Sequence, residues 1–359
     1  MNIFYDARWT RIDFHDGISR YGAGIMQGFK DNNIPITILI KDMRQLKMLP
    51  SDLPYLLIND PLSFKELFIA KKLNKLGADA VVTPFQIIGT WWRKYKLIVT
   101  LHDTIYYLHP QAPTNMPLMQ RIVWRLFHMV KWPQRLLLNS ADKVATVSNY
   151  SKSNIQKLGL TDREICVIYN APSLDPSQVH RSENVTKNIL YMGSFMPYKN
   201  VEVLIKSMAE LPNDFTLHLL SKILDDRKAE LSKLIHPDVN VVFHNGVSDY
   251  EYIELLQGAY CLASGSKEEG FGLPIIEAQM IGTPVVCSDM TIFHEVAGDG
   301  ALFFNSDDPK QFADQVRKLE DADFQKQLVA KGKIQAEKFT WKKSAKTLYD
   351  ILENLQNNK

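Results

Sequence analysis

The sequence predicts two α/β domains, each built as a doubly wound parallel sheet with helices on both faces. The chain has 359 residues, more than a single hydrophobic core usually organises. Short apolar runs rich in Ile, Leu and Val alternate with longer helical patterns, which is typical of buried parallel strands and their crossover helices. A polar stretch without periodicity, residues 171–187, contains two prolines and separates two such series.

The first series predicts an N-terminal domain over residues 1–174. Asn2–Tyr5 is expected to form a strand and Ser19–Phe29 the helix that follows it. The chain enters this helix through Asp16 and Gly17, a pair that favours a turn. Further strands are expected, in chain order, at Pro35–Ile40, Ala80–Val82, Leu97–Leu101, Val144–Val147 and Arg163–Ile168.

The second series predicts a C-terminal domain over residues 188–338, after a linker at 175–187. It begins with a strand at Asn188–Tyr191 and the helix Val201–Ala209. The last segment, 339–359, contains an amphipathic helix at Thr340–Leu355. The other strands are expected at Phe215–Leu220, Val239–Phe243, Tyr260–Ala263 and Pro284–Val286, and the other helices at Asp249–Gln257 and Pro274–Met280.

The composition is that of an ordinary globular protein, with 45% hydrophobic and 23% charged residues and a net charge of +2. The three cysteines are far apart and fit neither a metal site nor a disulfide framework. The N-terminus shows no signal-peptide pattern. No apolar run reaches the roughly 18–20 residues that a membrane-spanning helix needs. The sequence therefore predicts a cytoplasmic protein.

The most informative stretch lies before and within the helix expected at Pro274–Met280. Gly270 and Gly272 lack a Cβ, so the backbone there can bend sharply and approach a ligand closely. Pro274 suits the first turn of a helix, and the N–H groups of a helix N-terminus form a phosphate site. Glu269 and Glu277 flank this turn, and carboxylates accept hydrogen bonds from sugar and ribose hydroxyls. The stretch therefore predicts a pocket for a phosphorylated sugar.

The stretch Ser266–Glu277 matches the pattern S-x-x-E-G-F-G-L-P-x-x-E at every fixed position. It resembles the E-x7-E signature of retaining glycosyltransferase family 4, the glycosyl transferases group 1, and the resemblance extends over nearly the whole chain. It implies a GT-B architecture, in which two Rossmann-like domains face each other across a cleft and the final helix returns to the N-terminal domain. By this resemblance Glu269 contacts the donor sugar and Glu277 the ribose. The backbone positions implied for donor binding are Gly270, Phe271, Gly272 and Leu273.

A second matching segment runs from Tyr191 to Asn200 and is similar to the family's donor-phosphate loop, which implies donor contacts at Gly193, Ser194 and Lys199. Lys199 is the cation expected to stabilise the departing diphosphate. The family commonly has an arginine where this chain has Ser194, so one cation of the usual pair is missing. We consider Arg20, in the N-terminal domain, as its substitute.

Two segments of the N-terminal domain also resemble the family. The run Asp16–Tyr21 is similar to its first glycine loop, which implies that Gly17 and Arg20 lie near the donor diphosphate and the acceptor. His102 and Asp103 follow an expected strand and therefore lie at the carboxyl end of the sheet. The resemblance gives His102 a catalytic position near the transferred sugar and places Asp103 on the acceptor side.

Two stretches mix aromatic and basic residues: Trp91–Lys96 and Arg121–Arg135, the latter with Trp124, Phe127 and Trp132. Basic amphipathic segments with tryptophan can lie on an anionic membrane surface, which would suit a lipid-linked acceptor. An ordinary core helix with a solvated basic face is the alternative. No nucleic-acid recognition motif accompanies them, so a nucleic-acid partner is not expected.

The sequence thus predicts a retaining hexosyltransferase that uses a nucleotide diphosphate sugar and acts in surface polysaccharide or glycoconjugate synthesis. GDP-mannose is favoured as the donor, and a glycan or polyprenyl-linked acceptor is expected at the inner face of the membrane. We expect neither a metal nor a cofactor, because no D-x-D pair occurs in a metal-binding loop context. Two alternatives remain open: a GT-B sugar-nucleotide epimerase and a non-catalytic, glycosyltransferase-like partner subunit.

Overall fold

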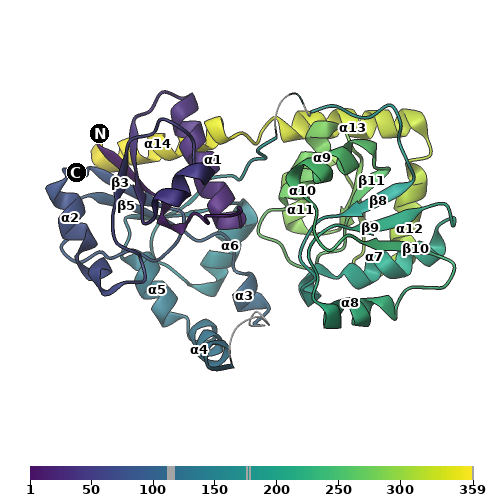
Figure 1. Ribbon diagram of the computed structural model, residues 1–359, viewed down its shortest axis with the longest axis horizontal. Coiled ribbons are helices and arrows are strands. Elements are labelled where there is room, and N and C mark those ends of the chain that lie inside the picture. Colours follow the sequence, from purple (N-terminus) through teal and green to yellow (C-terminus); the bar gives the residue numbers. More distant parts are fainter. Residues whose placement is uncertain (111–117, 175–176, 178, 358–359) are drawn as a thin grey trace. The chain divides into compact units, whose positions relative to one another are not determined.

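The computed structural model describes residues 1–110, 118–174, 177 and 179–357. The chain divides into two compact units, which are described separately. Unit 1 comprises Met1–Ala171 and Phe339–Lys359, and unit 2 comprises Pro172–Lys338 (Figure 1). Each unit contains one sheet in which every strand pair is parallel. The predicted fold class of two parallel α/β domains is therefore confirmed.

The sheet of unit 1 has seven strands in the order β3-β2-β1-β4-β5-β6-β7. The first strand lies inside the sheet and pairs with β2 on one side and β4 on the other. Its residues are fully buried, because helices cover both faces. The strands are β1 (Ile3–Asp6), β2 (Ile36–Ile40), β3 (Tyr55–Leu57), β4 (Ala80–Thr83), β5 (Lys96–Thr100), β6 (Lys143–Thr146) and β7 (Ile165–Val167).

The helices of unit 1 connect these strands and cover the sheet. Three short 3-10 helices, η1 (Ala7–Trp9), η2 (Met43–Met48) and η3 (Phe64–Phe68), follow the first three strands. The side chain of Phe127, from the predicted basic stretch, lies outside the described residues. The α-helices are α1 (Gly17–Asp31), α2 (Ile69–Lys75), α3 (Ile105–Leu108), α4 (Leu118–Met129), α5 (Trp132–Asn139), α6 (Asn149–Leu158) and α14 (Trp341–Asn357).

The C-terminal helix α14 packs directly against α1, although the two helices lie at opposite ends of the sequence (Figure 1). A Cβ at Gly28 would lie 2.2 Å from the carbonyl oxygen of Trp341 and 2.8 Å from the Cβ of Ala345. Only glycine therefore permits this close helix–helix contact. Trp341 and Ala345 are themselves buried. The apolar face predicted for 340–355 is therefore the face that α14 packs against α1 within unit 1.

Unit 2 has a six-stranded parallel sheet in the order β10-β9-β8-β11-β12-β13. Its strands are β8 (Asn188–Tyr191), β9 (Thr216–Leu219), β10 (Asn240–Phe243), β11 (Cys261–Ser264), β12 (Val285–Ser288) and β13 (Leu302–Phe304). Its helices are α7 (Val201–Ser207), α8 (Asp225–Ser232), α9 (Asp249–Gly258), α10 (Leu273–Ile281), α11 (Thr291–Ala297), α12 (Pro309–Lys318) and α13 (Ala322–Ala336), with short helices η5 (Pro197–Lys199), η6 (Met208–Glu210) and η7 (Gly298–Gly300).

Every strand expected from the sequence is present, with its ends shifted by at most two residues. The strands β3 and β13 were not predicted, because each has only three residues and too few apolar positions to show a pattern. Residues 175, 176 and 178 of the expected linker lie outside the described residues. The end of the linker contacts α9, since the N–H of Thr186 donates to the carbonyl of Gly258 at 2.9 Å.

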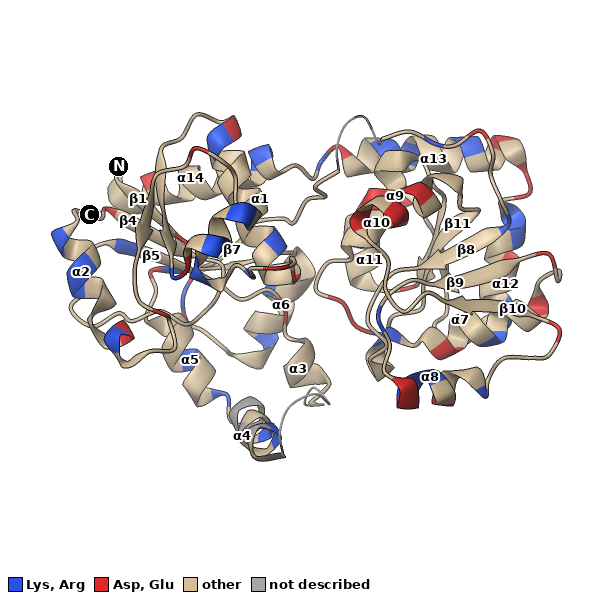
Figure 2. Cartoon of the chain, in the orientation of Figure 1, with Lys and Arg blue, Asp and Glu red and all other residues tan. Residues whose placement is uncertain are grey.

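Charges are distributed differently on individual helices, with lysines on α2 and carboxylates on α9 (Figure 2). Within the described part of the chain, no helix combines the length and apolar character needed to cross a bilayer.

Candidate functional site

The predicted sugar-phosphate loop connects β11 to α10 and ends in an unusual backbone turn. Gly272 has φ +99°, a conformation that residues with a Cβ rarely adopt. It precedes α10, whose first turn contains Pro274 and has no side-chain cap. Phe271 is buried and fixes the loop beside the helix. The N–H groups of the first helical turn thus face no capping side chain, and together with the helix dipole they favour an anion.

Lys199 and Glu269 form the central ion pair of this site. The Nζ of Lys199 lies 2.5 Å from Oε1 of Glu269, and the two side chains are 14% and 15% exposed. Oε1 also accepts a hydrogen bond from the hydroxyl of Ser266 at 3.1 Å. The structure therefore brings together a cation and a carboxylate that are 70 residues apart in the sequence.

The loops that carry this pair are held together by hydrogen bonds to backbone carbonyls. Asn200, at φ +48°, donates through Nδ2 to the carbonyls of Gly265 at 3.0 Å and Ser306 at 2.7 Å. The N–H of Lys267 donates to the carbonyl of Tyr198 at 2.7 Å. Asn200 was not predicted as a site residue. The signal that could have identified it is its type and place, because asparagine tolerates positive φ and directly follows Lys199.

Glu277 lies one turn into α10 and is 5% exposed. Its Oε2 accepts a hydrogen bond from the hydroxyl of Tyr252, on α9, at 3.0 Å. This bond fixes the direction of the carboxylate before any ligand arrives. Tyr252 was not predicted as a site residue. It lies 25 residues before Glu277, and no pattern in the sequence indicates that the two side chains are in contact.

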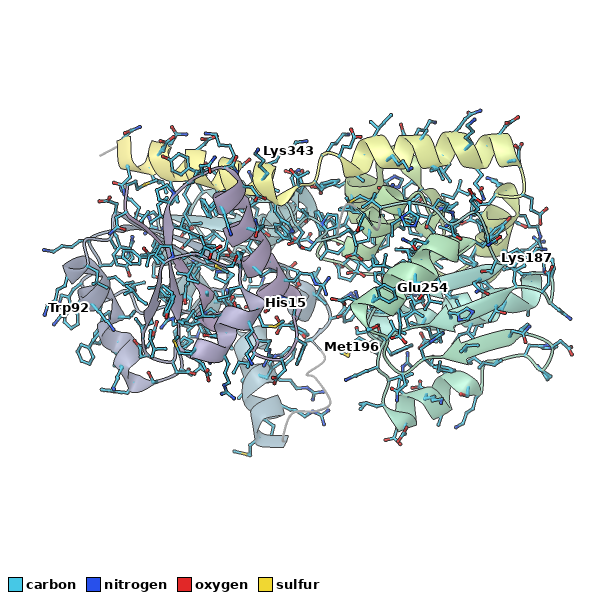
Figure 3. All side chains as sticks on the ribbon, turned by 45° about the horizontal axis from the view of Figure 1, so that its top comes forward. His15, Trp92, Lys187, Met196, Glu254 and Lys343 are labelled. Carbon is cyan, nitrogen blue, oxygen red and sulfur yellow. The ribbon has the colours of Figure 1, made fainter. Side chains whose placement is uncertain are left out.

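The loop after β8 begins with Gly193 and Ser194 and leads through Met196, labelled in Figure 3, to Lys199. The N–H of Gly193 donates to the hydroxyl of Ser221 at 3.2 Å. The carbonyl of Ser194 accepts from the hydroxyl of Tyr191 at 2.6 Å, and the serine side chain is exposed. Ser194 therefore supplies no positive charge at this position.

Two other cations belong to segments that contact this loop. Arg227 donates through Nε to the carbonyl of Phe195 at 3.0 Å, but its charge is matched by ion pairs with Glu202 and Glu230. Lys222 follows Ser221 directly and lies beside Gly246, where a Cβ would come within 2.8 Å of the Cγ of the lysine. Among the described residues no carboxylate pairs with Lys222, so its positive charge is available to a ligand.

In unit 1 the predicted glycine loop forms the N-terminus of α1. Asp16 caps this helix, accepting from the N–H of Ser19 at 2.9 Å, and it also pairs with Arg11 at 2.8 Å. A Cβ at Gly17 would meet nothing within 4 Å, so packing within the chain does not require glycine there. Arg20 lies on the same turn and is partly buried. Because the Asp16 side chain already caps this helix end, its N–H groups are less available to a phosphate than those of α10.

His102 lies after β5, where its ring meets the ring of Tyr21 edge-on at 4.8 Å. Desolvation lowers the pKa of His102 to about 4, against smaller opposing effects of the Pro84 carbonyl and Asp16. Its Nε2 lies 2.9 Å from the carbonyl oxygen of Pro84. A carbonyl only accepts, so Nε2 carries the proton and Nδ1 is an acceptor at neutral pH.

Asp103, the predicted acceptor-side residue, accepts from the N–H of Ile105 at 3.0 Å and thereby holds the start of α3. Within unit 1 the structure therefore brings Tyr21 of α1 against His102, and within unit 2 it brings Lys199 against Glu269, three residues before Gly272 at the start of α10.

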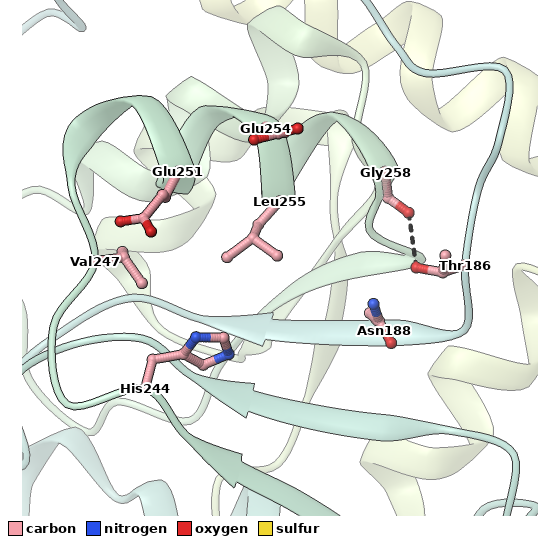
Figure 4. A pocket seen from close by; sticks show the side chains of 8 residues that line it. All are labelled: Thr186, Asn188, His244, Val247, Glu251, Glu254, Leu255 and Gly258. Carbon is pink, nitrogen blue, oxygen red and sulfur yellow. Dashed lines mark hydrogen bonds between the residues drawn. The ribbon is translucent and has the colours of Figure 1, made fainter.

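A cavity of about 380 Å³ lies elsewhere in unit 2, between α9 and the sheet (Figure 4). His244 lines it and bonds to His218 at 2.9 Å, and Thr186 donates to the carbonyl of Gly258 at 3.1 Å. It includes none of the predicted site residues. In the part of the chain that the structure describes, no group of three or more His, Cys, Asp or Glu side chains is placed to hold a metal ion.

Comparison with solved structures supports the two-domain architecture. The chain is similar to sucrose-phosphate synthase from Thermosynechococcus elongatus, with a TM-score of 0.73, 15% identity and coverage of 100% of both chains. It is similar to Alr3699/HepE of Anabaena in complex with UDP and glucose, with a TM-score of 0.73, 17% identity and coverage of 98% and 99%. At these identities the likeness shows the fold, which is that of the GT-B glycosyltransferases.

Curated relatives are more similar in sequence. The chain is 30% identical over 237 residues to O-antigen chain mannosyltransferase RfbU of Salmonella typhimurium, which is 63% of this chain and 65% of that protein. It is 28% identical over 222 residues to O-antigen chain mannosyltransferase B of Escherichia coli, 57% of this chain and 58% of that protein. The matched part thus spans less than two thirds of either relative.

Two family models match adjacent parts of the chain. The model described as "Glycosyltransferase Family 4" matches residues 43–175, and the model "Glycosyl transferases group 1" matches residues 176–335. They meet close to the boundary between the two units and together cover most of both. The chain belongs to glycosyltransferase family 4, and curated O-antigen mannosyltransferases are among its relatives.

Proposed function

We propose that this chain transfers a hexosyl group from a nucleotide diphosphate sugar to a glycan or polyprenyl-linked acceptor, with retention of anomeric configuration. The observation that carries the proposal is the ion pair of Lys199 and Glu269, next to the uncapped N-terminus of α10. One place thus offers a cation and N–H groups for a diphosphate and a carboxylate for sugar hydroxyls. Mannose is favoured because the curated relatives named above are mannosyltransferases, and GDP remains the nucleotide favoured from the sequence.

In this proposal the chain's own residues act mainly by stabilising charge and by positioning. Lys199 and the N–H groups of α10 hold the diphosphate as negative charge develops on it. The bond between the anomeric carbon and the phosphate oxygen breaks, and the acceptor oxygen bonds to the same face of that carbon. The acceptor proton passes to a phosphate oxygen of the leaving group. Neither a metal nor a cofactor takes part.

Glu269 is assigned to the sugar hydroxyls and not to nucleophilic attack. Its Oε1 already receives the Lys199 ammonium and the Ser266 hydroxyl, and both contacts reduce the nucleophilicity of the carboxylate. A lysine ammonium has three N–H donors, so Lys199 can hold Glu269 and a phosphate oxygen together. Glu277, directed by Tyr252, is assigned to the ribose.

Unit 1 is assigned to the neutral groups of the reaction. His102 would accept a hydrogen bond from a sugar hydroxyl through Nδ1, because Nε2 donates to Pro84. Gly17 leaves open space for the transferred sugar or the acceptor. Asp103 and Arg20 are proposed contacts to the acceptor and the donor. We also propose that the chain works at the inner face of a membrane, where a polyprenyl-linked acceptor would lie.

The first prediction concerns the product and the metal. With GDP-mannose and a suitable acceptor, NMR should show a product of the same anomeric configuration as the donor, and excess EDTA should leave the rate unchanged. An inverted anomer would refute the mechanism, and loss of activity in EDTA would refute metal independence.

The same assay distinguishes the two alternative functions. Donor conversion to an epimer without acceptor product would support the epimerase alternative, whereas no turnover with any nucleotide sugar would support a non-catalytic partner subunit.

The second prediction concerns the cation that replaces the missing arginine at position 194. We propose Lys222, because it directly follows Ser221, whose hydroxyl accepts from the N–H of Gly193, and because no carboxylate among the described residues pairs with it. Lys222→Gln should raise the KM for the donor about tenfold, equivalent to roughly 1.4 kcal/mol. Lys233→Gln, at an exposed lysine after α8, is the control. If Arg20→Gln gives this loss and Lys222→Gln does not, the assignment is wrong.

The third prediction follows from the lowered pKa of His102. In the unfolded chain His102 binds a proton below its ordinary pKa of 6.5, whereas in the folded chain it does so only below about 4. Folding stability is therefore lost as pH falls from 6.5 to 4, by up to about 3 kcal/mol from this residue.

His102→Gln should remove this contribution, since the glutamine amide can still donate to Pro84. Urea unfolding at pH 7 and pH 4.5 should show a smaller acid-induced loss of stability in the variant than in the wild type. His236→Gln, at an exposed histidine, should behave like the wild type. An equal acid-induced loss in wild type and His102→Gln would contradict the neutral, desolvated imidazole.

A further inference from the structure

Unit 1 has a surface on which large aromatic side chains and lysines are exposed together. Phe64 is 79% exposed, Trp91 61% and Trp92 54%. Monomeric proteins rarely leave such rings grouped in solvent unless the surface binds a partner. Figure 3 labels Trp92 at the edge of this unit. We call this the aromatic–lysine surface, and it comprises Phe64, Phe68, Trp91, Trp92, Lys65, Lys71, Lys72, Lys75 and Lys94.

The aromatic rings form one continuous row across two segments of the chain, η3 and the loop with Trp91 and Trp92. The ring of Phe64 lies 6.4 Å from that of Phe68, which stacks on Trp92 at 6.3 Å. Trp92 in turn meets Trp91 edge-on at 5.6 Å. The Nζ of Lys71 lies 3.7 Å above the ring of Trp92. The row therefore combines apolar area with positive charge in direct contact.

The exposure of the tryptophans is imposed by the backbone. Trp92 has φ +64°, which a bulky residue adopts only when its surroundings enforce it. Asn74, at the end of α2, donates to the carbonyl of Trp92 at 2.7 Å and accepts from the N–H of Lys94 at 3.0 Å. Upstream, the N–H of Gly89 donates to Glu66 at 3.0 Å. The loop is thus fixed at both ends on η3 and α2.

The charge of the surface has one sign. Residues 62–76 and 90–96 contain seven Lys and Arg and a single acidic residue, Glu66. Glu66 is buried and pairs with Arg8, whose Nη1 lies 2.6 Å from Oε2. The lysines of α2 are visible in Figure 2. The charge presented to solvent is therefore positive.

A hollow of about 530 Å³ opens within this surface. Its apolar lining comes from β3 and from Phe68 and Ile69. Lys65 and Lys72 also line it. This combination of an apolar wall and two ammonium groups matches a phosphate headgroup with the start of an acyl chain. The lining residues are Leu57, Ile58, Asn59, Lys65, Phe68, Ile69 and Lys72.

We propose that the aromatic–lysine surface docks the chain on a bilayer that contains anionic phospholipid. The aromatic rings enter the interface, and the lysines meet the headgroup phosphates. This deepens the membrane contact proposed above by naming the surface that makes it, and it involves none of the catalytic residues. The positive charge selects anionic over zwitterionic lipid.

Flotation with vesicles tests the proposal on the full chain. The wild type should float with vesicles of phosphatidylcholine mixed with phosphatidylglycerol and remain behind with phosphatidylcholine alone. Lys65→Gln with Lys72→Gln should weaken binding about 20- to 30-fold, since each lysine near an anionic surface contributes about fivefold. Phe64→Ser with Trp91→Ser should weaken it by at least as much, and this loss should persist at high salt, where the contribution of the lysines is screened.

The control is Lys331→Gln with Ile334→Ser, at exposed positions on α13 in unit 2, which should bind like the wild type. Unfolding temperature and donor turnover of every variant are measured alongside, so that a folding defect or failure of the proposed transferase activity is recognised separately. The proposal is overturned if the wild type ignores anionic vesicles, if both surface variants bind as tightly as it does, or if a single-stranded oligonucleotide displaces it from the vesicles.

Discussion

The ion pair between Lys199 and Glu269 is the interaction on which the candidate site depends. Both side chains are largely removed from water, and a buried charge without its partner costs several kcal/mol. The pair therefore requires the two loops that carry it to stay together, and the bonds of Asn200 to Gly265 and Ser306 serve this end. The same loops place the N-terminus of α10 beside the pair. In the proposed function, this arrangement is in place before a diphosphate sugar binds.

The two units differ in the charge they offer to a ligand. Unit 2 presents Lys199, Lys222 and an uncapped helix N-terminus, which suit a diphosphate. In unit 1 the corresponding helix end is occupied by Asp16, and His102 is neutral. Neutral donors and acceptors suit hydroxyl groups, because they orient a hydroxyl without competing for the phosphate. These local charges support the proposed division of roles, with the donor phosphates held by unit 2 and the sugar or acceptor hydroxyls by unit 1.

Much of the fold could be predicted from the sequence, because buried parallel strands appear as apolar runs and the loop Ser266–Glu277 has a specific pattern. Tyr252, Asn200 and Lys222 could not, because their roles arise from tertiary contacts between segments far apart in the chain. The aromatic–lysine surface was half predicted. Trp91–Lys96 was singled out for its composition, whereas no prediction was made for Phe64 and Phe68, which η3 places in solvent.

The most direct test of the central claim compares two ligands by titration calorimetry, GDP-mannose and GDP. If Glu269 holds the sugar and Lys199 the diphosphate, Glu269→Gln will weaken the binding of GDP-mannose about tenfold or more. The same variant will bind GDP as tightly as the wild type or more tightly, because Lys199 no longer pairs with a carboxylate. Lys199→Gln will weaken both ligands. Unchanged affinity of Glu269→Gln for GDP-mannose, or of Lys199→Gln for GDP, would contradict the account.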